Sequence, residues 1–227
     1  MLLALDTATT TASIALYNLE TDTLVAETTW QARRRHTQDV LPTVELMMRQ
    51  MDVTPQQLTA LAVTTGPGSF TGVRIGISTV KGMGIGLPET TRFLGVPTLS
   101  VMAGTWLDAH KGPVCATIQA GRGRFNWAMF DASQMLWRPQ RSDHQAGKED
   151  EFLQFLSEQA DGSPILLVGE LTETLVAQAS ALPHVQVVDT ISGQRRSGQL
   201  ARLAALHFAQ GTEDTLAALQ PLYLREP

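Results

Sequence analysis

Short apolar runs that alternate with longer amphipathic stretches organise the first half of the chain. Strands are predicted at residues 2–5, 12–17, 24–30 and 58–65 from their alternating or continuous apolar patterns. Apolar residues then recur at helical spacing from Val40 to Met51, and we expect a kink at Pro42, which has no N–H to donate. Successive N-terminal strands are unlike a Rossmann fold, in which the first strand leads directly into a helix.

The second half repeats this mixture of strands and helices. Strands are predicted at residues 91–96, 114–119, 125–130, 165–168 and 185–188, and helices at 99–109, 149–159, 172–182 and 197–207. Lys111-Gly112-Pro113 is the best candidate for a boundary between lobes. We therefore predict an α/β protein with a first lobe at 1–110, a second lobe at 111–196, and a C-terminal helix and tail at 197–227 that packs back on the first lobe. The two halves hint at a duplicated α/β unit, although their sequence similarity is too weak to prove it.

Composition excludes several classes of protein. The 227 residues include 17 basic and 22 acidic side chains, a net charge of −5, which argues against non-specific binding to nucleic acid or to an anionic membrane. The single cysteine, Cys115, allows neither an intrachain disulfide nor a thiolate zinc cluster. The N-terminus lacks the basic region of a signal peptide, and no apolar run is long enough to span a bilayer. We expect a soluble cytoplasmic protein.

The segment from Gly66 to Arg74, Gly-Pro-Gly-Ser-Phe-Thr-Gly-Val-Arg, is the most informative motif. It is not a Walker A loop, because Thr71 stands where the second glycine belongs and no Gly-Lys-Ser/Thr follows. A helix should begin near Ser69 or Thr71, either of which can cap it. Two interpretations stay open: a tight turn before a capped helix, or a turn whose backbone N–H groups bind an anion.

The helix after this motif contains small residues at four-residue spacing, namely Gly72 with Gly76, and Ser78 with Gly82 and Gly86. Each helical glycine costs roughly 1 kcal/mol relative to alanine. The compensating gain is close approach of another helix along that face. That helix belongs either to this chain or to another chain.

Two polar turns are candidate anion sites, each with a simpler alternative. Asp6 with Thr7, Thr9 and Thr10 could hold phosphate or Mg²⁺, or could satisfy its own backbone. Arg122 and Arg124 on a glycine-containing turn could bind phosphate, or could belong to a solvated hairpin.

Catalytic patterns are missing from the sequence. No two histidines stand at i and i+4, and no G-x-S-x-G nucleophile elbow occurs. We therefore predict no catalytic and no metal-binding residue.

Several segments together resemble one known family. Residues 3–8, 12–16, 36–42, 66–76 and 81–82 are similar to those of the TsaB (YeaZ) family, bacterial factors for tRNA threonylcarbamoyladenosine biosynthesis. The similarity is strong over the first hundred residues, thins in the second half and returns weakly at 221–225. The segment from Gly66 to Gly76 is highly specific to the family.

The resemblance implies an actin-like ATPase fold (ASKHA, RNase H-like) of two lobes with mixed sheets flanked by helices. It implies a non-catalytic subunit that binds and activates its paralogue TsaD in the modification of adenosine 37 of tRNA, with the ATPase TsaE joining the pair. The chain would form a homodimer when alone, would meet tRNA only through the complex, and would not contact a membrane. It would require no cofactor of its own, with weak ATP or ADP binding at or near the TsaD interface.

The resemblance also indicates what this chain lacks. Aligned on Val96, the two metal-binding histidines of TsaD fall on Thr98 and Met102, which are poor ligands for such a metal. Near the nucleotide segment of TsaD this chain has Glu170, whose carboxylate would repel phosphate. The turn at Asp6, Thr7, Thr9 and Thr10 would then be a vestigial phosphate loop. The alternative function is an ATP-dependent kinase or a metalloprotease-like enzyme of the same fold.

The predicted partner-binding residues come from the first two long helices. They are Val40, Leu41, Val44, Met47 and Met48 in the first helix, and Gly72, Val73, Gly76 and Val80 in the second. Methionine side chains adapt well to irregular interfaces. We expect Val44→Asp or Gly76→Leu to abolish TsaD binding and to leave the monomer folded.

Overall fold

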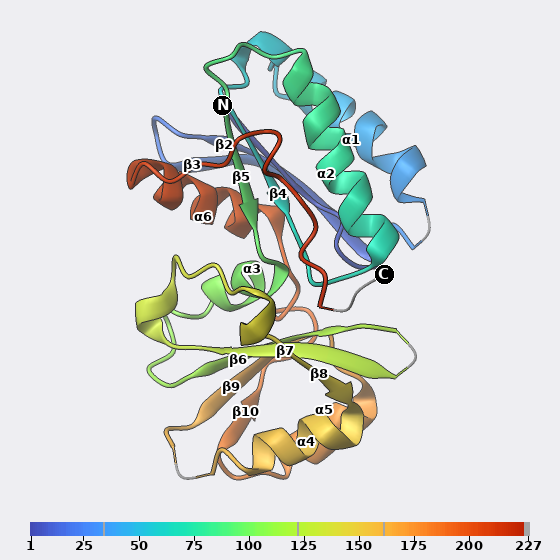
Figure 1. Ribbon diagram of the computed structural model, residues 1–227, viewed down its shortest axis with the longest axis vertical. Helices are drawn as coiled ribbons and strands as arrows, with labels where there is room; N and C mark the ends of the chain where they lie inside the picture. The colour runs from blue at the N-terminus through green and yellow to red at the C-terminus, as the bar shows by residue number, and fades with distance from the viewer. Residues whose placement is uncertain (34, 122, 161, 225–227) are drawn as a thin grey trace. The chain divides into compact units, whose positions relative to one another are not determined.

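The computed structural model describes residues 1–33, 35–121, 123–160 and 162–224 (Figure 1). These residues form two compact units. The first unit contains Met1–Thr98 and Arg196–Leu222, and the second contains Leu99–Arg195 with Tyr223 and Leu224.

The first unit is built on a five-stranded mixed sheet. Its strands are β1 (Leu2–Asp6), β2 (Thr11–Asn18), β3 (Thr23–Gln31), β4 (Ala60–Thr64) and β5 (Arg92–Val96), in the order β3-β2-β1-β4-β5. β2 runs antiparallel to both β1 and β3, whereas β4 runs parallel to both β1 and β5. The register places Leu5 beside Ile14 on one side and beside Val63 on the other, so the centre of the sheet is continuously apolar.

Three helices pack on this sheet. α1 (His36–Gln50) and α2 (Phe70–Ile85) lie next to each other on one face, and α6 (Ser197–Ala209) covers β1 and β2 from the other (Figure 1). α1 is one helix through Pro42, and its apolar stripe joins the core cluster of the sheet. A short 3₁₀ helix (Pro55–Gln57) precedes β4.

The segment after α6 covers the free edge of β5. The Asp214 N–H donates to the Phe93 carbonyl at 2.8 Å, and the Asp214 carboxylate accepts from the Gly95 N–H at 2.8 Å. Leu219 is only 2 % exposed and belongs to the core cluster of the unit. The β5 edge of the first sheet is thus covered, while β3 forms the other edge.

The second unit has its own five-stranded sheet. Its strands are β6 (Val114–Gln119), β7 (Arg124–Phe130), β8 (Gln145–Lys148), β9 (Ile165–Gly169) and β10 (Val185–Val187), in the order β10-β9-β6-β7-β8. One apolar cluster joins this sheet to the helix α3 (Thr98–Gly104), and another joins it to α4 (Glu149–Ser157) and α5 (Glu173–Ser180). Trp127 stacks on Phe152 at 4.6 Å between ring centroids in the second cluster. Two 3₁₀ helices, Ala132–Gln134 and Arg141–Asp143, lie between β7 and β8.

The two sheets have the same topology. In each, the first strand lies at the centre, the next two continue antiparallel on one side, and the last two continue parallel on the other. The predicted fold class, an α/β protein with mixed sheets flanked by helices, is confirmed, and the hint of a duplicated unit has a topological basis. β8 was missed because Gln-Ala-Gly-Lys has no alternating apolar pattern.

The division between the units differs from the predicted lobe boundary. The chain leaves the first unit after Thr98, not after residue 110, and returns to it at Arg196. The reason is the packing of Leu99, Met102 and Leu107, which share an apolar cluster with strands of the second unit. α3 is also shorter than the predicted helix at 99–109. The C-terminal helix α6 lies in the first unit, on β1 and β2.

The single cysteine provides a test of the second core. Cys115 lies in β6 with 0 % exposure, and burial raises the pKa of its thiol well above the usual range. We expect the native protein at pH 8 to react negligibly with a thiol reagent such as dithiobisnitrobenzoate, because the thiolate is the reactive form. One equivalent should react after denaturation in guanidinium chloride. Rapid stoichiometric labelling of the native chain would contradict this packing.

Candidate partner-binding surface

The glycines at the start of α2 accommodate the turn between β1 and β2. A Cβ atom at Gly72 would lie 2.2 Å from the Thr7 carbonyl oxygen, and one at Gly76 would lie 2.5 Å from Thr7 Oγ1. Gly68 is equally close to the turn, since its Cβ would lie 2.2 Å from the Ala8 carbonyl oxygen. The close approach predicted from Gly72 and Gly76 is therefore made by a turn of this chain and not by a helix.

The polar groups of that turn are engaged within the unit. Asp6 Oδ1 accepts from the Ala8 N–H at 2.9 Å and from Thr64 Oγ1 at 3.0 Å. The Thr7 hydroxyl donates to the Gly72 carbonyl at 2.7 Å, and the Thr9 carbonyl accepts from His36 Nε2 at 2.9 Å. These bonds tie the starts of α1 and α2 to the same turn.

The start of α2 follows the sequence prediction. Ser69 is the N-cap, and its hydroxyl accepts from the Gly72 N–H at 3.2 Å. The Ser69 N–H itself donates to the Ala8 carbonyl at 2.6 Å. Gly66 has a φ of +108°, a backbone conformation that favours glycine. Gly-Pro-Gly-Ser is thus a tight turn, and the capped helix that follows it packs against the β1–β2 turn.

Most of the predicted partner-binding residues face the interior of the first unit. Eight of the nine are buried, and Leu41 is exposed at 53 %. The buried ones are Val40, Val44, Met47, Met48, Gly72, Val73, Gly76 and Val80. Val44→Asp and Gly76→Leu each place atoms or charge in a filled core, so we expect both changes to destabilise the first unit and not to leave the monomer folded.

A subset of the exposed residues of α1 and α2 defines a different surface. We call it the α1–α2 surface and define it by Leu41, Phe70, Arg74, Ser78, Gly82 and Ile85. Phe70 is 46 % exposed with the Arg74 guanidinium 3.7 Å above its ring centroid, and Ile85 is 81 % exposed. A Cβ atom at Gly82 would meet no other atom within 4 Å. Residue spacing in the sequence identifies the buried apolar stripe but does not show which neighbouring residues are exposed. A glycine inside a helix, Gly82, was the one feature of the sequence that indicated this surface.

The second candidate anion site is the turn between β6 and β7. Gly121 and Gly123 both have positive φ, whereas Arg122 lies outside the described residues. Arg124 opens β7, and its guanidinium donates to the Ala146 carbonyl at 3.4 Å. This contact fits the simpler interpretation of a hairpin arginine.

The carboxylate of Glu170 is paired within the second unit. Its Oε2 accepts from the Gln119 N–H at 3.2 Å, and its Oε1 lies 3.7 Å from Nη1 of Arg195, whose side chain is 2 % exposed. Glu170 therefore joins the ends of β6 and β9 to the segment before α6. The predicted repulsion of phosphate assumed an unpaired carboxylate, whereas the charge of Glu170 is paired.

The described part of the chain contains no group of three or more His, Cys, Asp and Glu side chains that could hold a metal ion. Met102 packs in the apolar cluster of α3, and Thr98 is fully buried at the start of that helix. His110, His144 and His184 each hydrogen-bond a backbone carbonyl, at 3.0, 2.9 and 2.8 Å respectively.

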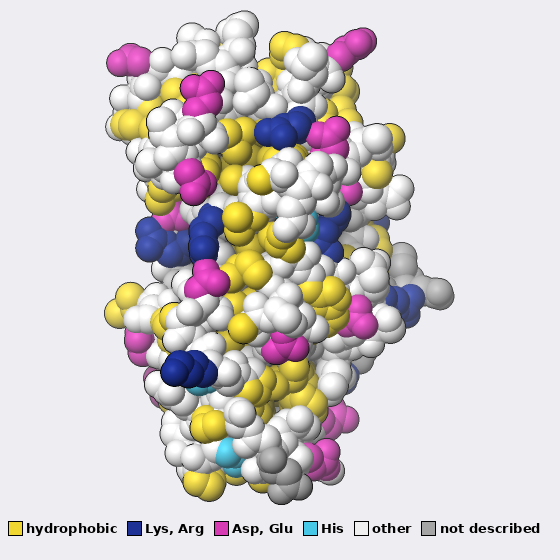
Figure 2. Space-filling view, turned by 90° about the vertical axis from the view of Figure 1, so that its left-hand side faces the viewer, with side chains coloured by type: hydrophobic (Ala, Val, Ile, Leu, Met, Phe, Trp, Pro, Cys, Tyr) yellow, Lys and Arg dark blue, Asp and Glu magenta, His cyan; other side chains and the backbone are white. Residues whose placement is uncertain are grey.

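Surface charge and helix length give two further observations. On the face shown in Figure 2, Lys and Arg side chains are interspersed with Asp and Glu, consistent with the net charge of −5. Within the described ranges, no helix has the length and apolar content needed to cross a bilayer.

Comparison with protein families gives a match over more than half of the chain. Residues 28–189 match the family model of TsaD, tRNA N6-adenosine threonylcarbamoyltransferase. The chain is 30 % identical to the tRNA threonylcarbamoyladenosine biosynthesis protein TsaB of Haemophilus influenzae, over 99 % of this chain and 93 % of that protein. It is 37 % identical to the protein of the same name from Escherichia coli, over 63 % of this chain and 60 % of that protein.

Solved structures with the same fold come from Pseudomonas aeruginosa. YeaZ superposes with a TM-score of 0.69 at 24 % identity, covering 98 % of this chain and 99 % of that one. A second crystal structure, of a protein described as similar to peptidase YEAZ, gives a TM-score of 0.72 at 23 % identity and covers 99 % of both chains. At these identities the likeness establishes the fold.

One matched pair of substitutions tests the two environments of the α2 glycines. Gly72→Ala is expected to lower the free energy of unfolding by about 1–3 kcal/mol, because the added methyl group meets the Thr7 carbonyl. Gly82→Ala is expected to raise it by roughly 0.5–1 kcal/mol, because the methyl group enters open space and alanine favours the helix. Urea unfolding followed by circular dichroism measures both. If both variants changed the free energy of unfolding in the same direction, the described contact between α2 and the β1–β2 turn would be contradicted.

Proposed function

The chain belongs to the TsaB family of tRNA threonylcarbamoyladenosine biosynthesis proteins, and on this premise we propose that it is a non-catalytic subunit that binds and activates TsaD. Membership places it in that biosynthetic pathway. Binding to TsaD, activation and the absence of catalysis by this chain are the parts that we propose. Since the pathway acts on tRNA, we place this activity in the cytoplasm.

The observation that carries the proposal is the open space at Gly82 beside exposed apolar side chains. A glycine inside a helix costs about 1 kcal/mol, and no atom of the described chain uses the space that Gly82 leaves. Leu41, Phe70 and Ile85 are large apolar side chains exposed on the same pair of helices. A partner helix that lies against Gly82 would cover them and offset both costs. We propose that TsaD supplies that helix.

The internal bonding of the β1–β2 turn supports a subunit without catalysis of its own. Asp6 and Thr7 already bind groups of this chain. We propose that the chain requires no cofactor, that ATP or ADP binds weakly at or near the TsaD interface, and that TsaE joins the TsaB–TsaD pair. tRNA is then met through the complex.

We propose that the same surface also mediates self-association of the chain in the absence of TsaD. Its exposed apolar residues would cover one another in a symmetric dimer, because one patch faces its own copy across a two-fold axis. We propose that this homodimer and the TsaD complex are mutually exclusive. Added TsaD should therefore dissociate the homodimer.

Substitutions on the α1–α2 surface test binding to TsaD. Leu41→Asp and Gly82→Leu should each weaken the complex at least tenfold, because one places a charge in an apolar interface and the other fills the space for the partner helix. Isothermal titration with purified TsaD measures the affinity, and a tRNA modification assay with TsaD and TsaE measures activation. Circular dichroism should show an unchanged fold, since both positions are exposed.

Ile191→Asp is the matched control for Leu41→Asp. Ile191 is 84 % exposed on a loop of the second unit, so the same kind of change occurs there in a residue that belongs to neither α1 nor α2. This variant should bind TsaD like the wild type. Wild-type affinity of both Leu41→Asp and Gly82→Leu would exclude the proposed interface, and tRNA modification by this chain alone would exclude the non-catalytic role.

A further inference from the structure

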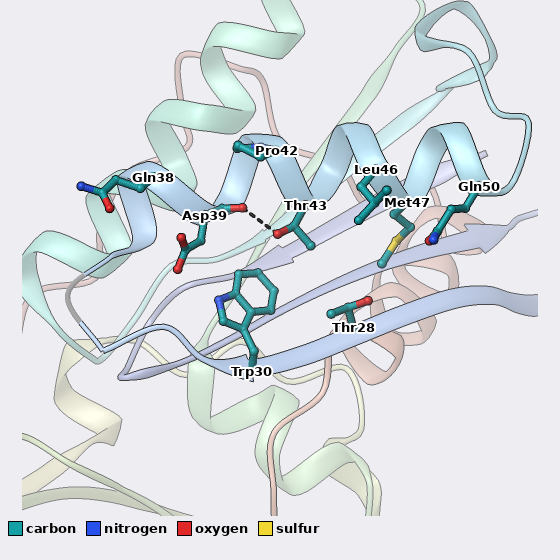
Figure 3. A pocket seen from close by; sticks show the side chains of 9 residues that line it. All are labelled: Thr28, Trp30, Gln38, Asp39, Pro42, Thr43, Leu46, Met47 and Gln50. Carbon is teal, nitrogen blue, oxygen red and sulfur yellow. Dashed lines mark hydrogen bonds between the residues drawn. The ribbon is translucent and has the colours of Figure 1, made fainter.

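A groove lies between α1 and the edge strand β3 of the first unit (Figure 3). Its volume is about 420 Å³, within the range of ligand and side-chain binding sites. It is lined by Thr28 and Trp30 of β3 and by Gln38, Asp39, Pro42, Thr43, Leu46, Met47 and Gln50 of α1. Nothing in the proposed role of the α1–α2 surface uses this groove.

The groove combines apolar side chains with polar ones and a single charged group. Trp30 projects from β3 toward α1, and Leu46 and Met47 face the same space from the helix (Figure 3). Leu46 is 44 % exposed, so a large apolar side chain remains uncovered here. Among the nine lining residues, Asp39 alone is charged, and its carboxylate points toward the side on which Trp30 lies (Figure 3).

The present partner of Asp39 is a side chain that remains largely in water. Arg35 Nη2 lies 3.3 Å from Asp39 Oδ1, and the Arg35 side chain is 70 % exposed. An ion pair this exposed contributes little to stability, so another cation can replace Arg35 at small cost. The carboxylate disfavours an anionic ligand in the same place.

The groove continues to a sheet edge with open hydrogen-bonding groups. β3 pairs with β2 on one side, and no strand of the described residues pairs with its other side. The opposite edge of the same sheet, at β5, is covered by the segment around Asp214. Thr28 and Trp30 are two residues apart, so both side chains point to the groove side of the strand.

We propose that this groove binds an extended segment of a partner protein that carries an arginine or lysine side chain. The segment adds to the edge of β3, and every second side chain then faces the groove. The cation lies over the Trp30 ring and pairs with Asp39, while an apolar side chain two residues away in the segment lies on Leu46 and Met47, beside Thr28. The open, elongated shape and the adjacent strand edge favour a chain segment over a small molecule.

This site is separate from the α1–α2 surface. At 100° per residue, Leu41 projects about 160° away from Asp39 around the axis of α1. Leu41 and Asp39 therefore lie on opposite sides of α1, and the side that carries Asp39 faces β3 and the groove (Figure 3). A segment bound in the groove and a helix bound at Leu41 occupy different sides of the helix, so failure of either proposal leaves the other standing.

The test uses the full chain and a designed peptide, acetyl-Ser-Leu-Ser-Arg-Ser-Leu-Ser-amide. In an extended conformation its leucines and arginine share one face. Titration followed by nitrogen–proton NMR should shift the Trp30 indole resonance, which a Trp30→Phe spectrum identifies among the four tryptophans. The peptide with glutamate in place of arginine should bind at least fivefold more weakly. Acetyl-arginine amide, which lacks the strand, should bind more weakly still.

Variants of α1 separate the role of the carboxylate from general effects of charge. Asp39→Asn should weaken peptide binding about threefold to fivefold, and Arg35→Ala should strengthen it about twofold, because the competing cation is gone. Glu45→Gln is the matched control: it removes the same charge from an exposed position of the same helix outside the groove, and binding should not change.

Four results would overturn the proposal. They are the absence of any Trp30 shift at millimolar peptide, wild-type affinity of Asp39→Asn, equal binding of the glutamate peptide, and equal binding of acetyl-arginine amide. The last result would identify a small-molecule site, and the third a purely apolar groove. TsaD affinity measured with Asp39→Asn should equal that of the wild type, which distinguishes this site from the α1–α2 surface.

Discussion

The first unit depends on the contact between the β1–β2 turn and the start of α2. No side chain can be accommodated at Gly72, where even a Cβ atom would lie 2.2 Å from the Thr7 carbonyl oxygen. The Thr7 hydroxyl donates a hydrogen bond to the Gly72 carbonyl, and His36 of α1 hydrogen-bonds the Thr9 carbonyl. One turn of a few residues therefore fixes both helices against the sheet. The helical glycines, unfavourable in isolation, are stabilised by this approach.

Fixing the two helices determines which of their faces reach solvent. The methionine-rich stripe of α1 and the Gly72–Val80 face of α2 turn inward, so interaction falls to the remaining faces. α1 then has two free sides with different chemistry. One side carries the exposed Leu41 of the α1–α2 surface, and the side toward β3 combines Asp39 with Trp30 in a groove. The two proposed binding sites therefore use different sides of the same helix.

The two sheets have the same topology, but the turns at equivalent positions make different contacts. The turn after β1 holds Asp6 and Thr7 in a network that anchors helices. The turn after β6 instead has two glycines at positive φ, and the end of the neighbouring β9 carries Glu170 paired with Arg195. The two sheets share their strand order and directions. The polar turns, which the core does not constrain, have acquired different partners.

The sequence by itself determined most of the strands and helices, though not β8, together with the cap at Ser69, the mixed α/β class and the family, because each depends on local spacing or on a contiguous motif. It could not determine which neighbour used the space at Gly72 and Gly76, since a turn 65 residues away from Gly72 in the chain supplies the contact. Nor could it separate the buried stripe of α1 from the exposed Leu41, assign α3 to the second unit, or bring Trp30 opposite Asp39. Those features depend on which surfaces meet after folding, and only the tertiary structure decides that.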